Sequence, residues 1–321
     1  MMKAVVITEY GGPEVLQLQE VPDVHAGPGQ IRVRVHAAAV NPADTLQRHG
    51  DIDESAFHDA PSPRRPGMDL AGIVDEIGPG ADTDLRVGDR VMGVVFPIDP
   101  SGGAYAEHVV LDPRQVAHAP AGTSHAEAAT VPMNGLTARR ALDVLDLPPG
   151  SWIAVTGAAG AVGGYVVELA KVVGLNVIAD AAPADIELVS RLGADEVLPR
   201  GDGLADRILQ LHPDGVDAVV DAALLSAKIE PAVRPGGQFA GLRRPGERGT
   251  SPLAGRPDIA VRDVWVPDYR YARDKRDGLR RLVEKKSLTT RVAASYPAEQ
   301  AAEAHRKLEA GGVRGRLVLA F

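Results

Sequence analysis

The sequence of 321 residues contains no cysteine. This absence excludes disulfide bonds, thiolate metal ligands and cysteine nucleophiles. The sequence also lacks any apolar run long enough to span a bilayer. Its N-terminal segment has neither an extended apolar stretch nor a small-residue cleavage site, so we expect no signal peptide. These absences favour a cytoplasmic protein without a membrane partner.

An excess of positive charge is missing as well. Asp and Glu number 43 against 35 Lys and Arg, which gives a formal net charge of -8. Because an acidic surface repels phosphate backbones, we expect no nucleic-acid partner. The length is sufficient for two domains, and the 45% hydrophobic and 24% charged residues are typical of a globular enzyme.

The chain contains two kinds of pattern. Residues 31–35 alternate apolar and charged side chains, and other short strands near the N-terminus are bounded by Gly or Pro, which indicates a small β-rich domain. From residue 151 to about 242, strands alternate with helices, which indicates a doubly wound parallel sheet. Residues 238–241 and 264–266 are expected to be late strands of that sheet.

A glycine-rich loop follows the first strand of the alternating region. Gly160 and Gly163 match the second and third glycines of the dinucleotide-binding fingerprint, while Ala158 occupies the first position. The helix that follows begins near Ala161 and Val162, and its first amide groups would face phosphate oxygens. The alternative is a tight turn without a ligand.

Several segments together resemble a known family. They are Gly11–Leu16, Val40–Asp44, Pro66–Gly72, Val87–Val91, Gly103–Glu107, Gly135–Ala138 and Val313–Leu319. Their order and spacing are similar to the zinc-independent quinone oxidoreductases, the zeta-crystallin-like branch of the medium-chain dehydrogenase/reductase superfamily. The resemblance implies an α/β protein with a GroES-like β-rich catalytic domain (residues 1–125, completed by 267–321). A Rossmann cofactor domain with a doubly wound parallel sheet would cover residues 126–266.

The resemblance also implies where nicotinamide binds. Asn41 and Met68 occupy positions where zinc alcohol dehydrogenases carry Cys and His, so we expect neither zinc nor another metal site. Asn41 and Thr137 match residues that contact the nicotinamide ribose or ring; the alternatives are a strand-end turn and a helix cap. Many relatives carry a tyrosine at the position of Leu46, so a proton-donor role of that tyrosine cannot be carried over. Tyr105 is another candidate proton donor; the alternative is a buried strand tyrosine.

Evidence on the cofactor is divided. Asp180 ends the second strand of the alternating region, where an acidic residue favours NADH. In an alignment with the family, however, the acidic residue of the zinc enzymes falls on Ala182. The phosphate-binding Lys of some relatives is replaced by Ile186. Arg200 matches a site beside the 2′-phosphate in relatives, and its guanidinium suits phosphate. We therefore expect NADPH, with NADH possible. The late-strand residues Ala240 and Gly241 complete the predicted cofactor contacts.

Without a Lewis acid, the easiest acceptors are already electron-poor. The sequence therefore predicts NAD(P)H-dependent reduction of a quinone or an activated alkene. Two alternatives stay open: an NADPH-binding structural or regulatory protein with little catalysis, and a pathway-specific enoyl reductase. The apolar late strands also predict a homodimer, because an unprotected sheet edge favours pairing with a second chain.

Overall fold

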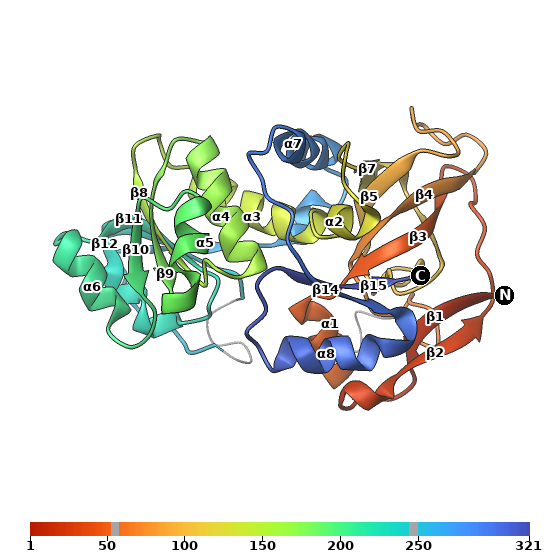
Figure 1. Ribbon diagram of the computed structural model, residues 1–321, viewed down its shortest axis with the longest axis horizontal. Helices are drawn as coiled ribbons and strands as arrows, with labels where there is room; N and C mark the ends of the chain where they lie inside the picture. The colour runs from red at the N-terminus through yellow and green to blue at the C-terminus, as the bar shows by residue number, and fades with distance from the viewer. Residues whose placement is uncertain (53–57, 244–249) are drawn as a thin grey trace. The chain divides into compact units, whose positions relative to one another are not determined.

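The computed structural model describes residues 1–52, 58–243 and 250–321 (Figure 1). The chain divides into two compact units. The β-rich unit comprises Met1–Met133, Asp268–Lys285 and Thr290–Phe321, and the parallel-sheet unit comprises Asn134–Pro267 and Lys286–Thr289. The predicted α/β class, with a β-rich part and a parallel-sheet part, is confirmed. The predicted limits of the catalytic and cofactor domains, after residues 125 and 266, stay a prediction.

The β-rich unit contains a hairpin and a larger sheet. The hairpin pairs β1 (Met2–Ile7) with β2 (Leu16–Val21). The larger sheet has the strand order β14-β15-β3-β4-β5-β7, and β6 also pairs with β3. Its strands are β3 (Ile31–Ala39), β4 (Asp69–Ile77), β5 (Arg90–Val94), β6 (His108–Leu111), β7 (Val116–His118), β14 (Val292–Pro297) and β15 (Arg316–Ala320). Its helices are α1 (Pro42–His49), α2 (His125–Ala129), α7 (Arg273–Glu284) and α8 (Ala301–Glu309).

Strand β3 holds this sheet together. One half of β3 pairs with β6, with Val33 opposite Val109, and the other half pairs with β15, with Ala39 opposite Val318. Alternate residues of β3, such as Ile31, Val33 and Val35, are buried in the core, as the period of a half-buried strand requires. Segments from both ends of the sequence therefore complete one sheet.

The parallel-sheet unit has six strands in the order β10-β9-β8-β11-β12-β13, all parallel. They are β8 (Trp152–Thr156), β9 (Asn176–Ala181), β10 (Glu196–Pro199), β11 (Val216–Asp221), β12 (Val233–Gly241) and β13 (Ala260–Asp263). The helices are α4 (Ala161–Val172), α5 (Ile186–Arg191), α6 (Leu204–Leu211) and α3 (Pro132–Leu145), whose first two residues belong to the other unit. Counted along the chain, the strand order is 3-2-1-4-5-6, and ligands bind such sheets at the carboxyl ends of the strands where the order reverses.

One predicted strand is misplaced. Residues 264–266 are not a strand; β13 ends at Asp263, and Val266 begins a short 3-10 helix, Val266–Tyr269. This edge strand is difficult to predict from sequence, because Arg262 and Asp263 are charged whereas buried parallel strands are mostly apolar.

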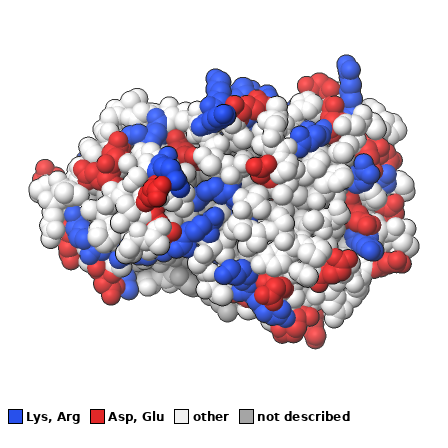
Figure 2. All heavy atoms as spheres, viewed as in Figure 1, with Lys and Arg blue, Asp and Glu red and all other residues white. Residues whose placement is uncertain are grey.

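Charged residues on the visible face of Figure 2 include both signs, often side by side. Some pairs are one helical turn apart, such as Arg280 and Glu284 at 2.9 Å in α7. Exposed pairs of this kind contribute about 0.5 kcal/mol or less each. Among the described residues, no helix is long and apolar enough to cross a membrane.

Candidate cofactor site and buried polar network

The glycine loop joins β8 to α4 in the parallel-sheet unit. Gly157 has a φ of +66°, a left-handed conformation that favours glycine, and Gly160 caps the amino end of α4. A Cβ at Gly163 would lie 2.3 Å from the carbonyl oxygen of Gly157, so only glycine lets the helix pack against the loop this closely. Gly163 therefore has the packing role expected of the third fingerprint glycine.

Gly160 lies in a more open position. A Cβ there would meet only the Gly157 carbonyl oxygen, at 3.1 Å. Ala161, Val162 and Gly163 provide the first amide groups of α4, which have no acceptor within the helix. An open space beside outward-facing amides suits the pyrophosphate of a dinucleotide, so the residues present fit the predicted cofactor.

At the carboxyl end of the neighbouring strand β11, the side chain of Asp221 is occupied by hydrogen bonds within the protein. The Asp221 carboxylate accepts hydrogen bonds from Thr156 Oγ1 at 2.6 Å and from the Ser226 amide at 2.7 Å. In β12, the Ala240 side chain is fully buried, and a Cβ at Gly241 would lie 2.7 Å from the Arg243 carbonyl oxygen. Any contact of Ala240 with a cofactor would therefore come from its backbone.

Asp180 supports the glycine loop instead of facing outward. Its side chain is 2% exposed, and its Oδ1 accepts the amides of Gly157 at 2.6 Å and Ala158 at 3.3 Å. Its Oδ2 accepts Arg200 Nε at 3.1 Å. Asp180 thus connects the loop after β8 with Arg200, which follows β10.

Two other residues of the predicted cofactor site lie after β9. Ala182 precedes the short 3-10 helix Pro183–Asp185, and Ile186 is 47% exposed at the start of α5. Neither side chain supplies a charge. Arg200, whose side chain is 43% exposed, is therefore the cation that contacts Asp180 at this edge of the sheet.

Asn41, in the β-rich unit, lies before α1 and is 2% exposed. Its Nδ2 donates to Asp69 Oδ2 at 2.8 Å, while its Oδ1 has no hydrogen-bond partner among the described residues. The remaining Asp69 oxygen accepts the Met133 amide at 2.6 Å. Asp69 thereby fixes the side-chain amide group of Asn41 and leaves Oδ1 of Asn41 available to accept a hydrogen bond.

Tyr105 belongs to a directed chain of hydrogen bonds. Arg48 can only donate, so His305 Nδ1 accepts from it at 3.2 Å and His305 carries its proton on Nε2. His305 Nε2 then donates to the Tyr105 hydroxyl at 3.3 Å, and that hydroxyl donates to Asp44 Oδ2 at 3.0 Å. Tyr105 precedes β6 and is not itself in a strand. The hydrogen-bond donor of its hydroxyl is therefore already used in the contact with Asp44.

Burial changes the acidity of this network. Burial raises the pKa of Asp44 to about 6 and that of Asp69 to about 7, despite the hydrogen bonds that each carboxylate accepts. Burial, assisted by the positive charge of Arg48, lowers the pKa of His305 to about 3. His305 is therefore neutral near pH 7, as the hydrogen-bond directions require.

The other predicted residues have simpler surroundings. Thr137 is half-buried and lies inside α3, so the helix-cap alternative is wrong. Met68 precedes β4, and its carbonyl oxygen accepts the Val95 amide at 2.9 Å. Within residues 1–52, 58–243 and 250–321, no group of three or more His, Asp or Glu side chains could hold a metal ion.

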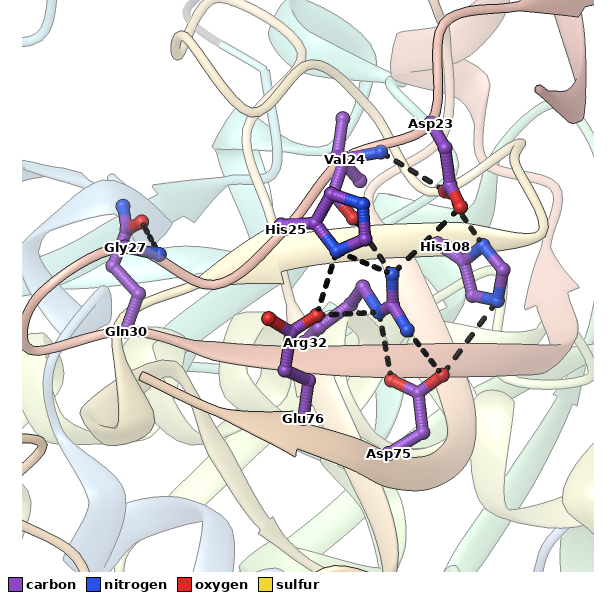
Figure 3. Close-up of polar contacts among 9 residues, drawn as sticks. All are labelled: Asp23, Val24, His25, Gly27, Gln30, Arg32, Asp75, Glu76 and His108. Atoms are coloured by element: carbon purple, nitrogen blue, oxygen red, sulfur yellow. Dashed lines mark hydrogen bonds and ion pairs between the residues drawn. The ribbon is translucent and has the colours of Figure 1, made fainter. Parts of the chain in front are cut away.

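A charged cluster on the β-rich unit is held together by hydrogen bonds and ion pairs among its own residues (Figure 3). Arg32 forms paired hydrogen bonds with Asp75 at 3.0 and 3.1 Å, and Asp23 accepts from His108 at 3.0 Å. The Arg32–Asp75 pair joins β3 to β4, and His108 Nε2 in β6 lies 3.6 Å from Oδ2 of the same aspartate. Arg32 is the one arginine of the cluster and faces three carboxylates, those of Asp23, Asp75 and Glu76, so these contacts serve to stabilise the sheet.

Sequence reasoning missed Asp44, Asp69 and His305. Both aspartates lie within the motifs of the family resemblance, and for Asp69 a carboxylate next to the apolar residues of a strand was a usable signal. His305 gave none, because its contact with Tyr105 joins residues 200 positions apart.

The fold and the loop together define a protein with one GroES-like and one dinucleotide-binding domain, and comparisons with known proteins agree. The alcohol dehydrogenase GroES-like domain matches residues 27–121, and the zinc-binding dehydrogenase domain matches residues 192–319. An alcohol dehydrogenase of Geobacillus stearothermophilus is 30% identical over 99% of this chain and 99% of its own. The chain belongs to the medium-chain dehydrogenase/reductase family of oxidoreductases.

Other relatives carry more specific names. A chloroplastic NADPH-dependent alkenal/one oxidoreductase of Arabidopsis thaliana is 35% identical over 75% of this chain. The chain spans 62% of the length of that relative. The structure of the quinone oxidoreductase from Coxiella burnetii has a TM-score of 0.85 and 27% identity, covering 100% of this chain and 99% of that one.

Proposed function

We propose that this protein is an NADPH-dependent, zinc-independent oxidoreductase that reduces a quinone or an alkene conjugated to a carbonyl. The observation that carries the proposal is the open space at Gly160, next to the first amides of α4 and at the carboxyl edge of the parallel sheet. Relatives named for quinone and alkenal/one reduction support the choice of acceptor.

The chain's own residues have binding and positioning roles. Ala161, Val162 and Gly163 bind the pyrophosphate through backbone amides. Arg200 binds the 2′-phosphate, and Asn41 and Thr137 contact the nicotinamide nucleoside. When bound, NADPH supplies the hydride.

The source of the proton is a separate part of the proposal. Tyr105 is the candidate that the sequence offers. To donate to a substrate, its hydroxyl would have to turn away from Asp44, which it now contacts at 3.0 Å. Burial and the nearby Asp44 charge also raise the pKa of Tyr105 well above 10. Replacement of Tyr105 by Phe separates the two roles: a donor predicts a lower reduction rate, whereas a buried packing residue predicts mainly lower stability.

Zinc independence rests on the side chains available. Asn41 uses its amide nitrogen to bind Asp69, and Met68 replaces the imidazole ligand of zinc-dependent relatives. We expect full turnover after dialysis against a chelator, measured together with elemental analysis. A requirement for stoichiometric zinc would contradict this part of the proposal.

The reaction itself is tested with four matched reactants. These are a quinone, a conjugated enone, the corresponding saturated ketone, and ethanol with oxidised cofactor. We expect NADPH oxidation with the first two and negligible rates with the others, because only the first two are electron-poor without a Lewis acid. Equal rates with the saturated ketone or ethanol would refute the proposal. Tight NADPH binding without turnover of any acceptor would instead support a structural or regulatory role.

We further propose a cytoplasmic homodimer. Strand β13 ends the six-stranded sheet, and Val261 within the strand and Trp265 just after it are each 53% exposed. An exposed edge with apolar side chains favours pairing with a second copy. Light scattering at micromolar concentration is expected to give the mass of a dimer, and a monomer alone would contradict it.

A further inference from the structure

We propose that Asp180 is a positioning residue that selects NADPH by orienting Arg200, and not an acid that binds the ribose of NADH. This inference rests on the proposed function, because it concerns the same cofactor site. An acidic residue at the end of β9 is expected to favour NADH, whereas in this proposal Asp180 favours NADPH.

The contacts of Asp180 leave no room for a ribose. Both carboxylate oxygens already accept hydrogen bonds, Oδ1 from the glycine loop and Oδ2 from Arg200. The side chain is 2% exposed. Because the side chain is buried, a ribose hydroxyl could reach it only if the glycine loop or Arg200 moved, and the 2.6 Å bond from the Gly157 amide opposes movement of the loop.

The same contacts orient Arg200. Its backbone amide donates to the Ala181 carbonyl oxygen at 2.9 Å, and its Nε donates to Asp180 at 3.1 Å. Neither Nη1 nor Nη2 has a hydrogen-bond partner among the described residues, and the side chain is 43% exposed. These two nitrogens form the face of the guanidinium that binds a phosphate with two parallel hydrogen bonds.

The chemistry of the neighbouring residues agrees with this assignment. Ala182 offers no carboxylate that would repel a phosphate at the end of β9. Because Asp180 holds Nε, Arg200 loses less side-chain freedom when a ligand binds. Asp180 thus links the loop that would bind pyrophosphate to the cation that would bind the 2′-phosphate.

The test compares NADPH with NADH, which differ only in the 2′-phosphate, by calorimetric titration without an acceptor. In Asp180→Asn, the amide oxygen can still accept from Gly157, but the amide nitrogen opposes Arg200 Nε. We expect NADPH affinity to fall about tenfold, with NADH affinity unchanged within about twofold. A ribose-binding acid predicts the reverse, since its removal weakens NADH and favours NADPH. An unchanged or increased preference for NADPH would overturn the proposal.

A double-mutant cycle tests whether Asp180 acts through Arg200. Arg200→Ala alone is expected to lower NADPH affinity about tenfold, and adding Asp180→Asn is expected to lower it no further. Additive losses would overturn the positioning role.

The chain also offers a matched control. Asp217, at the opposite end of the sheet, accepts the Trp152 amide at 2.8 Å and Arg234 Nε at 2.8 Å. Asp217→Asn removes the same kind of contact and is expected to leave the ratio of the two affinities unchanged. If it changes the ratio as much as Asp180→Asn does, the effect is general and the proposal fails. If wild-type protein binds neither nucleotide, the proposed function fails first.

Discussion

The two units each bury an aspartate beside the segment assigned to function, but they surround it differently. Asp180 in the parallel-sheet unit contacts a cation, Arg200, together with two loop amides. Asp69 in the β-rich unit accepts hydrogen bonds from two neutral groups, the Asn41 amide and the Met133 amide, and burial raises its pKa to about 7. Two buried aspartates thus have different uses: Asp180 orients a cation, whereas burial makes Asp69 a weaker acid even though it accepts two hydrogen bonds.

The strongest test concerns the glycine loop. In Gly160→Val, the branched side chain would occupy the open space beside the first amides of α4, so we expect NADPH binding to fall more than about 100-fold. The melting temperature should change little, because a Cβ at Gly160 meets only one atom within 4 Å. Gly163→Val is the contrasting variant; its Cβ would lie 2.3 Å from a backbone oxygen, so it should destabilise the fold. Retained NADPH affinity in Gly160→Val would remove the basis for the cofactor site.

A second test concerns the β-rich unit. Asp44→Ala would leave three buried donors without their acceptor: the amides of Asn41 and Gly67 and the Tyr105 hydroxyl. We expect the free energy of unfolding in urea to fall by about 3 kcal/mol. Asp217→Ala, which removes a partly exposed ion pair, should lower it by about 1 kcal/mol or less. Equal losses would mean that the buried network adds no special stability.

A third test uses pH. Burial lowers the pKa of His305 in the folded state to about 3 from its ordinary value of 6.5. The unfolded chain therefore binds a proton that the folded chain does not, and stability is lost as pH falls below 6.5. His305→Gln keeps a donor and an acceptor but does not titrate. The stability difference between wild type and this variant should shift against wild type by about 1 kcal/mol between pH 7.5 and pH 5.5. A difference independent of pH would show that His305 titrates normally.

A small effect on stability is also expected at Asn41. Asn41→Ala removes hydrogen bonds to Asp69 and to the Ala39 carbonyl oxygen, together with an oxygen that has no partner among the described residues, so the free energy of unfolding should fall by about 1 kcal/mol. The proposed contact with the nicotinamide nucleoside predicts a larger effect on the reduction rate than on NADPH affinity. A normal rate would limit Asn41 to a structural role.

Local sequence patterns predicted the glycine loop because strand, loop and helix follow one another within about twenty residues of sequence. They also predicted the alternating strands and helices of the parallel sheet. The edge strand β13 was placed a few residues too late, because the apolar residues 264–266 look more like a strand than Ala260–Asp263 does. Apolar content marks central strands better than edge strands.

The role of Asp180 could not be predicted in this way. Its position at the end of β9 was clear, but the amide that it binds lies 23 residues earlier and Arg200 lies 20 residues later. Only the packed sheet brings these groups together. The sequence therefore indicated that Asp180 is near the cofactor, while its hydrogen bonds determine in which direction it acts.

The divided pairing of β3 has a consequence for the order in which the chain folds. The parallel sheet uses strands from Trp152 to Asp263 only, so its strands can pair as soon as that continuous stretch exists. By contrast, half of one edge of β3 can form its hydrogen bonds only after β15 has been synthesised, because Ala39 pairs with Val318. Closing so long a loop is slow, and until then the amide and carbonyl groups along that edge stay unpaired. During synthesis, the N-terminal sheet is therefore the last to be completed and the more exposed to mispairing.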